Sequence, residues 1–396
     1  MSNINIDFVK DSIDDITQIR RDIHAHPEMA FKEFRTSKLV QEKLDSYGIE
    51  THYGLAGTGV VGTLHGQAGE GLTIALRADM DALPIHEQTG IEYQSTHQGV
   101  MHACGHDGHT AMLLGAAKYF SEHRDFKGTI RFIFQPAEEG LGGAREMVKE
   151  GLFDLFPCDY IFGMHNMPGV PAGEFHLKNG AMLPSSDTWT VEFTGTGGHG
   201  SAPHKSTDIT IVAAQYINAI QTIVSRSVDP MENAVVSIGY IHAGNENAAN
   251  VIPSHIIIRG TARCFLPEIR DLIEEKLASL AEYTAKAFSC ESKVDYLRRY
   301  PATINQDDAY RIAVQAAQNT VGVDHVQSNS KPLSGSEDFS FYLEKIRGAY
   351  IALGNGESGR HSHMVHTPHF DFNDDIIKNG IVYWINVALA AQAYTA

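Results

Sequence analysis

The chain has few of the features that mark exported or membrane proteins. Its N-terminal residues contain no basic stretch followed by an apolar run, and no segment approaches the roughly 18 uninterrupted apolar residues of a membrane span. Only four of the 396 residues are cysteines, and they lie far apart: Cys104, Cys158, Cys264 and Cys290. In a chain without an export signal, such cysteines are thiols rather than disulfides. We therefore predict a cytoplasmic protein.

Positive charge is also scarce. The sequence has 31 lysines and arginines against 48 aspartates and glutamates, a formal net charge of −17. This balance argues against nucleic acids and anionic membrane surfaces as partners and leaves a small molecule as the expected one. A hydrophobic content of 43% with 20% charged residues is typical of globular proteins. Because the chain is too long for one ordinary core, we expect two domains.

Histidine, in contrast, is abundant, with 21 residues, many of them in clusters. The most informative string is MHACGHDGHT at 101–110, in which Cys104 and His106 supply a soft and a borderline metal ligand two residues apart. Taken alone, this spacing also fits a buried thiol beside a helix-capping residue. The acidic pair that follows in the sequence favours the metal site.

That acidic pair is Glu138 and Glu139, within the string QPAEEG at 135–140. Glutamate pairs are common at exposed helix starts, where carboxylates interact favourably with the helix dipole. Here the pair follows a predicted strand, and adjacent side chains need not point the same way. One can bind metal while the other handles a proton. The two strings together predict metal-assisted hydrolysis, with Glu139 on the metal and Glu138 on the attacking water.

Apolar runs alternate with helical patterns in the first half of the chain. The runs at 72–77, 128–134 and 160–164 are continuous, which favours strands of a mainly parallel sheet with helices on both faces. A polar motif follows each run, and open α/β sheets bind ligands at the carboxyl ends of their strands. The predicted site therefore lies along one edge of an α/β sheet.

The pattern changes in the second half. Strand and helix patterns follow the order β-α-β-β-α-β, the split βαβ arrangement of a ferredoxin-like α+β domain. Its first helix, 208–226, follows Ser206 and Thr207, which we expect to cap it. The predicted domains are a catalytic metal-binding domain (1–186 and 301–396) and an inserted domain (187–300).

Three more segments carry candidate histidines. His165 follows the 160–164 run, although a lone histidine at a strand end is more often a structural hydrogen-bonding residue. The tract 361–369 holds four histidines, of which only one or two can reach the same metals. His199 lies in a glycine-rich string, 195–203, that lacks the Lys-Ser/Thr ending of a phosphate loop. It is either a solvated loop residue or a group that polarises the scissile carbonyl.

Other assignments stay open at this point. Asp79 and Asp81 are either ligands or groups that orient ligating histidines. Cys104 is conceivable as a thiol nucleophile, but the glutamate pair would then have no role. The chain has no Gly-x-Ser-x-Gly string, so a serine hydrolase has little support.

Eight motifs, in order along nearly the whole chain, resemble those of one family. They are RDIHAHPE (21–28), LRADMDALP (76–84), HACGHDGH (102–109), QPAEE (135–139), GMHN (163–166), GGHGSAP (197–203), NVIP (250–253) and SEDF (336–339). The family is that of the dinuclear-metal amidohydrolases and metallopeptidases, which includes hippurate hydrolase, N-acyl-amino-acid deacylases and auxin-conjugate hydrolases. The sequence looks closest to the hippurate hydrolase branch.

The resemblance implies hydrolysis of the amide bond of N-acyl amino acids, whether hippurate-like, N-acetyl or N-aromatic-acyl. It implies two divalent metal ions per subunit, held by Cys104, His106, Glu139, His165 and His366. Glu138 would be the general base and acid, and His199 would stabilise the oxyanion in the active site of a partner subunit. Asn250 and Arg263 would contact the substrate. The inserted domain would be the dimerisation and lid domain of a homodimer or a dimer of dimers.

Two departures from the distant peptidases of this superfamily affect the metal. Those peptidases begin their first motif with a ligating histidine, where this chain has Asp79, and they use a bridging carboxylate where this chain has the Cys104 region. Cys104 is therefore a candidate bridge between the metals. Zinc or manganese is expected, with cobalt and nickel as further candidates. Two alternatives remain: a dipeptidase or carboxypeptidase of the same fold, and a non-catalytic metal-dependent binding protein.

Overall fold

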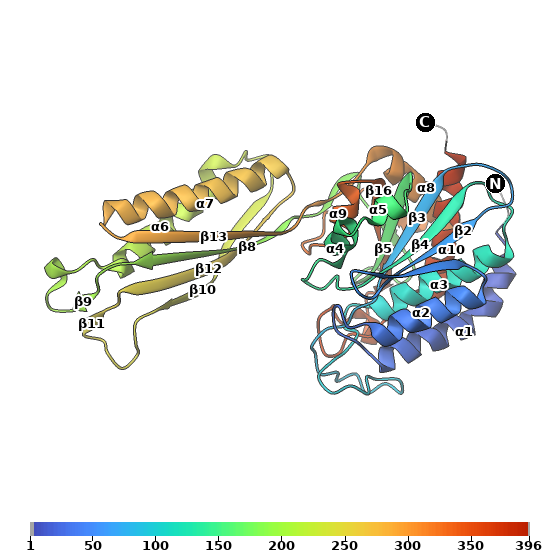
Figure 1. Ribbon diagram of the computed structural model, residues 1–396, viewed down its shortest axis with the longest axis horizontal. Helices are drawn as coiled ribbons and strands as arrows, with labels where there is room; N and C mark the ends of the chain where they lie inside the picture. The colour runs from blue at the N-terminus through green and yellow to red at the C-terminus, as the bar shows by residue number, and fades with distance from the viewer. Residues whose placement is uncertain (1–3, 395–396) are drawn as a thin grey trace. The chain divides into compact units, whose positions relative to one another are not determined.

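The computed structural model describes residues 4–394 and divides them into two units, each with its own sheet and apolar core (Figure 1). The first unit contains the described residues up to Met182, together with Ile304–Pro332 and the residues from Glu337 onwards. The second contains Leu183–Thr303 and Leu333–Ser336. Each unit is described by itself below.

An eight-stranded sheet forms the centre of the first unit, in the order β1-β2-β4-β3-β5-β16-β6-β15. Its four middle strands, β4, β3, β5 and β16, are parallel to one another, which confirms the predicted mainly parallel α/β sheet. Antiparallel pairs join β2 to β1 and β4 on one side and β6 to β16 on the other. The strands are β1 (Glu50–Leu55), β2 (Gly59–His65), β3 (Thr73–Asp79), β4 (Thr129–Gln135), β5 (Tyr160–Pro168), β6 (Phe175–His176), β15 (Val326–Gln327) and β16 (Arg347–Gly356).

Both faces of this sheet are covered, which explains the continuous apolar runs. On β3, Ile74 and Leu76 belong to the main core, whereas Ala75 and Arg77 are buried outside it on the alternate positions. Five long helices share the main core: α1 (Ile6–Ala25), α2 (Phe34–Ser46), α3 (His106–Glu122), α8 (Asp307–Val321) and α10 (Ile377–Ala393). Three short helices pack with the opposite face: α4 (Gly143–Lys149), α5 (Leu152–Leu155) and α9 (Ser340–Leu343).

The second unit has the element order of a ferredoxin-like domain. Its antiparallel sheet runs β10-β12-β8-β13, and α6 and α7 share one core with it (Figure 1). The elements are β8 (Ser186–Thr194), α6 (Ile209–Thr222), β10 (Ala234–Ala243), β12 (His255–Cys264), α7 (Pro267–Ala287) and β13 (Glu291–Tyr300). A shorter pair in this unit is β9 (Gly198–His199) with β11 (Val251–Ile252). A further pair, β7 (Gly180–Leu183) with β14 (Thr303–Asn305), contains the residues at which the chain leaves the first unit and returns to it.

Two local expectations were wrong. The cap of α6 is Asp208, whose carboxylate accepts the N–H of Thr210 at 3.0 Å, and not Ser206 or Thr207. Strand β5 continues to Pro168, so that His165 lies inside the strand and not after it, because β16 extends the ladder along its whole length. None of the helices in residues 4–394 combines the length and apolar composition that a membrane span needs.

Candidate metal centre and active site

The candidate metal ligands of the first unit gather where its parallel strands end. Asp79 of β3 and Gln135 of β4 are paired at the last position of their ladder. The segments that follow these two strands therefore emerge side by side, and they carry Asp81 and the glutamate pair. Strand β5, on the other side of β3, carries His165.

Glycine is required between Cys104 and His106. Gly105 is the residue before α3 and has φ 95°, in the left-handed region that favours glycine. A Cβ atom here would lie 2.2 Å from Oδ1 of Asn166 on β5. The absence of a side chain thus lets the loop approach β5, and Sγ of Cys104 lies 3.2 Å from Nε2 of His165.

Among residues 4–394, five groups of three side chains bring their ligand atoms within 4.8 Å of one another, and Cys104 belongs to two of them. One of these two is Cys104, His106 and His165, and the other is Cys104, Glu139 and His366. Oε1 of Glu139 lies 3.0 Å from Nε2 of His366 and 3.9 Å from Nε2 of His106. The structure therefore places all five predicted ligands together, with the cysteine common to both groups.

Hydrogen bonds determine which nitrogen of each histidine faces this cluster. Nδ1 of His106 donates to Oδ1 of Asp81 at 3.1 Å, and Nδ1 of His165 donates to the backbone carbonyl of Asn166 at 2.6 Å. Nε2 of His106 is buried and has no hydrogen-bond partner. Leaving such an atom unpaired costs free energy, and a metal ion bound to Nε2 of His106 would satisfy it.

The electrostatics of the cluster also favour a cation. Burial alone would lower the pKa of His106, but nearby carboxylates, Asp79 first among them, raise it to about 10. Burial raises the pKa of the Cys104 thiol well above its usual range, and the neighbouring carboxylates add to this effect. Because metals bind the thiolate and the neutral imidazole, a divalent cation would displace both protons. The donor set therefore fits a divalent metal.

His366 reaches the cluster from a strained backbone. Its φ is 63°, a sparsely populated region for a residue with a side chain, and its N–H donates to the carbonyl of Ala103 at 2.7 Å. Among the histidines of the 361–369 tract, only His366 belongs to a ligand group in the part of the chain that the structure describes. Its side chain is 52% exposed, so this ligand lies on the open side of the cluster.

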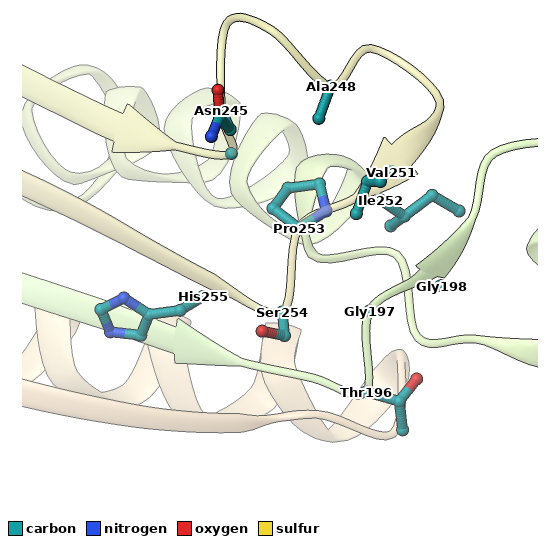
Figure 2. A pocket seen from close by; sticks show the side chains of 11 residues that line it. Thr196, Gly197, Gly198, Asn245, Ala248, Val251, Ile252, Pro253, Ser254 and His255 are labelled. Carbon is teal, nitrogen blue, oxygen red and sulfur yellow. The ribbon is translucent and has the colours of Figure 1, made fainter.

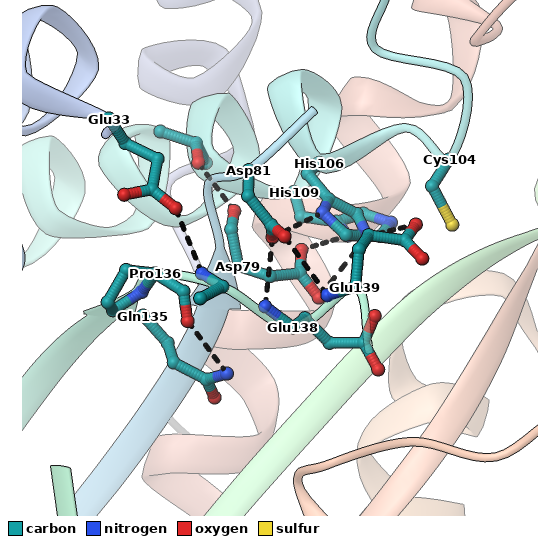
Figure 3. A network of polar contacts seen from close by, with 12 residues as sticks. Glu33, Asp79, Asp81, Cys104, His106, His109, Gln135, Pro136, Glu138 and Glu139 are labelled. Atoms are coloured by element: carbon teal, nitrogen blue, oxygen red, sulfur yellow. Dashed lines mark hydrogen bonds and ion pairs between the residues drawn. The ribbon is translucent and has the colours of Figure 1, made fainter. Parts of the chain in front are cut away.

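The glutamate pair is oriented through its backbone. The carboxylate of Asp81 accepts the N–H of Glu138 at 3.1 Å with one oxygen and the N–H of Glu139 at 3.0 Å with the other (Figure 3). The residue before the pair, Ala137, has φ 55°. This turn directs the two adjacent side chains to different neighbours: Glu139 contacts His366, and Glu138 lies within 4.8 Å of ligand atoms of Glu337 and Asp338.

The side chain of Glu138 lies beside the ligand cluster. One of its oxygens is within 4.8 Å of ligand atoms of His106 and Glu139, and the N–H of Asp338 donates to Oε1 at 3.4 Å. Burial, and after it the charge of Glu337, raises the pKa of Glu138 well above its usual range. Glu138 therefore lies where a general base beside the candidate metals is expected, and its role in proton transfer stays a prediction.

The two aspartates left open by the sequence both orient histidines. Asp79 lies 2.6 Å from Nδ1 of His109 and accepts a hydrogen bond from Arg77 at 2.7 Å. Nε2 of His109 lies 2.7 Å from Oδ1 of Asn166, so both of its ring nitrogens are engaged. Asp81 contacts His106 in the same manner as Asp79 contacts His109, which favours a supporting role for both carboxylates.

Sequence reasoning missed the buried charges behind the site. Arg77 is fully buried and donates to Gln135, Asp79, Glu337 and Asp338 at 2.7 to 3.0 Å. A charged residue at the end of the apolar 72–77 run was the one available signal. The guanidinium balances three carboxylates, and two of them, Glu337 and Asp338, lie close to Glu138.

Three predicted site residues lie in the second unit. His199 is in strand β9, paired with Val251, and not in the loop we expected; its exposed ring accepts the N–H of Ser201 at 3.1 Å. Asn250 is exposed and its carbonyl accepts the N–H of Gly200 at 2.7 Å. Arg263, on β12, donates to the carbonyl of Ala262 at 2.9 Å.

A pocket of about 380 Å³ lies beside this two-stranded pair (Figure 2). Gly198 and Val251, which line it, are the sequence neighbours of His199 and Asn250. Asn245, Ser254 and His255 supply polar side chains to the same pocket. The roles of His199, Asn250 and Arg263 in the reaction stay predictions.

Comparison with known proteins agrees with this chemistry. Residues 75–390 match the model of peptidase family M20/M25/M40. The hippurate hydrolase of Campylobacter jejuni subsp. jejuni is 44% identical over 372 residues, which cover 94% of this chain and 95% of that one. Thermostable carboxypeptidase 1 of Saccharolobus solfataricus is 38% identical over 378 residues, 94% of each chain.

A solved structure shows the same architecture. A Bacillus subtilis protein, described as a dinuclear metal binding peptidase from the M20 family, superposes with a TM-score of 0.84 at 32% identity. The match covers 98% of this chain and 100% of that one.

Proposed function

Because the chain belongs to peptidase family M20/M25/M40 and is a metal-dependent amidohydrolase, we propose that it hydrolyses the amide bond of N-acyl amino acids. The observation that carries the proposal is the pair of ligand groups that share Cys104, with Glu138 beside them. The similarity to hippurate hydrolase supports the substrate class, since hippurate joins an aromatic acyl group to an amino acid. The scope we propose includes hippurate-like, N-acetyl and N-aromatic-acyl amino acids.

The proposed cofactor is a pair of divalent metal ions per subunit. Cys104, His106 and His165 would hold one, and Cys104, Glu139 and His366 the other. Thiolate, imidazole and carboxylate ligands together suit zinc or manganese, and also cobalt or nickel. When bound, the metals would acidify the attacking water and polarise the amide carbonyl.

The protein's own part in the reaction is proton transfer. Glu138 takes a proton from the attacking water as the new carbon–oxygen bond forms. It then donates that proton to the amide nitrogen as the carbon–nitrogen bond breaks, which releases an amine and a carboxylic acid that ionises by passing its remaining proton to the solvent or the amine. A raised pKa makes the carboxylate of Glu138 a stronger proton acceptor. Asp81 holds the N–H of Glu138 and so limits where its carboxylate can lie.

We assign the second unit to substrate binding and assembly. His199 would stabilise the oxyanion, and Asn250 and Arg263 would contact the substrate carbonyl or carboxylate. Because His199 and Asn250 are exposed, they are free to meet a substrate held by a second subunit. The proposed assembly is a homodimer or a dimer of dimers, with the second unit as its dimerisation and lid domain.

The remaining proposals concern the cell. We place the protein in the cytoplasm, acting on a small molecule, with neither nucleic acid nor membrane as a partner. The net charge of −17 supports the absence of nucleic-acid and membrane partners, because phosphate backbones and anionic lipids would repel the protein.

The test is a substrate screen on enzyme reconstituted separately with zinc, manganese, cobalt and nickel. Hippurate, N-acetyl amino acids and free dipeptides are compared by release of the free amino acid. The proposal expects turnover of N-acyl amino acids above that of dipeptides. Preference for dipeptides or for C-terminal residues of peptides would favour the peptidase alternative, which the similarity to a carboxypeptidase keeps open. Stoichiometric metal binding with no amide turnover would favour the non-catalytic binding protein.

A further inference from the structure

A carboxylate from outside the eight sequence motifs contacts the turn that carries the glutamate pair. Glu33 precedes α2 and is fully buried, far from the pair in sequence. Its Oε1 accepts the N–H of Ala137 at 2.9 Å, directly before Glu138 (Figure 3). Its side chain makes no capping hydrogen bond to α2, so helix capping does not account for its burial.

Oε1 of Glu33 accepts hydrogen bonds from two strained turns. Oε1 of Glu33 also accepts the N–H of Phe31 at 2.9 Å. Phe31 has φ 61° and Ala137 has φ 55°, and they are two of five non-glycine residues with positive φ among residues 4–394. For a residue with a Cβ, this conformation is sparsely populated and energetically costly. A buried carboxylate that accepts both N–H groups offsets that cost and holds both turns.

Three consecutive backbone N–H groups are thereby bound by two carboxylates. Ala137 donates to Glu33, and Glu138 and Glu139 donate to the two oxygens of Asp81. Asp81 contacts only the two residues after Ala137, and Gly143 donates its N–H to the carbonyl of Ala137 at 2.9 Å, so the N–H of Ala137 is left to Glu33. Glu33 restrains the entry to the turn.

We propose that Glu33 is a positioning residue for the proton transfer: it holds Ala137 in its left-handed conformation and so aims Glu138 at the substrate. The proposal rests on the proposed function for the role of Glu138. It assigns Glu33 no contact with substrate or metal. Its effect passes through the backbone of Ala137 alone.

The chain offers a matched control at the same carboxylate. Oγ1 of Thr58 donates to Oε2 of Glu33, the oxygen that does not contact Ala137. Thr58→Val therefore removes one hydrogen bond from the same buried group without releasing the turn. If Glu33 only stabilised the fold, any loss of kcat in Glu33→Ala and in Thr58→Val would simply follow the loss in free energy of unfolding of each variant.

The experiment measures kcat, KM and the free energy of unfolding for Glu33→Ala, Glu33→Gln and Thr58→Val at saturating metal. Glu33→Ala is expected to lower kcat by about 10- to 100-fold with KM little changed, since misplacing a catalytic group by about 1 Å has an effect of this size. Glu33→Gln keeps an acceptor oxygen and is expected to retain most of kcat. Thr58→Val is expected to lose stability but keep kcat.

A second-site change tests the route through the backbone. Ala137→Gly removes the steric cost of the left-handed conformation. The double variant Glu33→Ala, Ala137→Gly is therefore expected to recover part of the kcat lost in Glu33→Ala. Wild-type kcat in Glu33→Ala, or loss of kcat in Thr58→Val in proportion to its loss of stability, would overturn the proposal.

Hydrogen exchange separates this inference from the proposed function. Exchange at the amides of residues 137–139 is expected to accelerate in Glu33→Ala and not in Thr58→Val, with or without a known substrate. If the wild type hydrolyses no amide but this pattern appears, the proposed function fails while the role of Glu33 in holding the turn stands. If the amides of 137–139 exchange alike in both variants and the wild type, that role is wrong.

Discussion

Nδ1 of His106 donates to Oδ1 of Asp81 at 3.1 Å, and this contact ties the Cys-x-His string to the segment that follows β3. The same carboxylate accepts the N–H groups of Glu138 and Glu139. Asp81 therefore orients a candidate ligand from each of the two strings 101–110 and 135–140, namely His106 and Glu139. Its geometry is the basis of the first prediction.

Asp81→Asn should weaken metal binding. An amide cannot accept from all three donors at once, so at least one of His106, Glu138 and Glu139 loses its orientation. Loss of such supporting contacts typically costs about 10- to 100-fold in metal affinity, and metal titration of the apoprotein measures it. Asp22→Asn, which alters a partly exposed pair with Arg35, is the control and should bind metal normally.

Glu138→Gln should separate chemistry from metal binding. Without the proton acceptor we expect kcat to fall by about 10²- to 10⁴-fold, while metal content stays at the wild-type level. Glu139→Gln should instead lose metal, because its oxygen lies among ligand atoms of Cys104 and His366. Wild-type turnover in metal-loaded Glu138→Gln would contradict the assigned role.

The sharing of Cys104 predicts unequal losses of metal. Because Cys104 belongs to both ligand groups, Cys104→Ser should reduce the affinity of both sites. His366→Ala removes a ligand from one group and should leave one ion tightly bound. Metal-to-protein ratios after dialysis distinguish the two, and equal stoichiometry in both variants would argue against a shared ligand.

Arg77→Met should destabilise the first unit strongly. Its side chain is fully buried against Asp79, Glu337 and Asp338. Removing one partner of a buried ionic group typically costs about 3–5 kcal/mol, to be measured by urea denaturation. Arg145→Met, at an exposed ion pair with Glu146, should change the free energy of unfolding by less than about 1 kcal/mol.

His24 predicts a pH dependence of stability. Burial would lower the pKa of His24, but the carboxylate of Asp107, 2.9 Å from Nδ1, outweighs it and raises the pKa to about 9. A raised histidine pKa stabilises the fold below the unfolded value near 6.5, and this contribution is lost as pH rises to about 9. The loss amounts to at most about 3 kcal/mol.

The comparison is between wild type and His24→Gln, both as metal-free protein, so that metal affinity does not add its own pH dependence. Between pH 6.5 and 9, the free energy of unfolding should fall more steeply in the wild type. Parallel curves would show that the pKa of His24 is not raised in the folded state.

Much of the fold was predictable because its signals are local. Continuous apolar runs such as 72–77 predict strands buried on both faces, and the order of patterns between β8 and β13 predicts the ferredoxin-like unit. The cap of α6 was misplaced at Ser206 and Thr207 because several residues in a row had suitable side chains. Only the backbone geometry selects Asp208.

The sequence by itself determined which residue types are available for chemistry: a cysteine and a histidine around a glycine, and two adjacent glutamates. These spacings are local in the sequence, and they predict only which residue types lie near one another along the chain. Only the tertiary structure decided that Cys104 is common to two ligand groups and that His366 is the histidine of its tract that joins them. Those choices depend on strand register and on contacts between segments hundreds of residues apart. The same is true of Glu33, whose partner Ala137 is set by packing and not by any pattern in the chain.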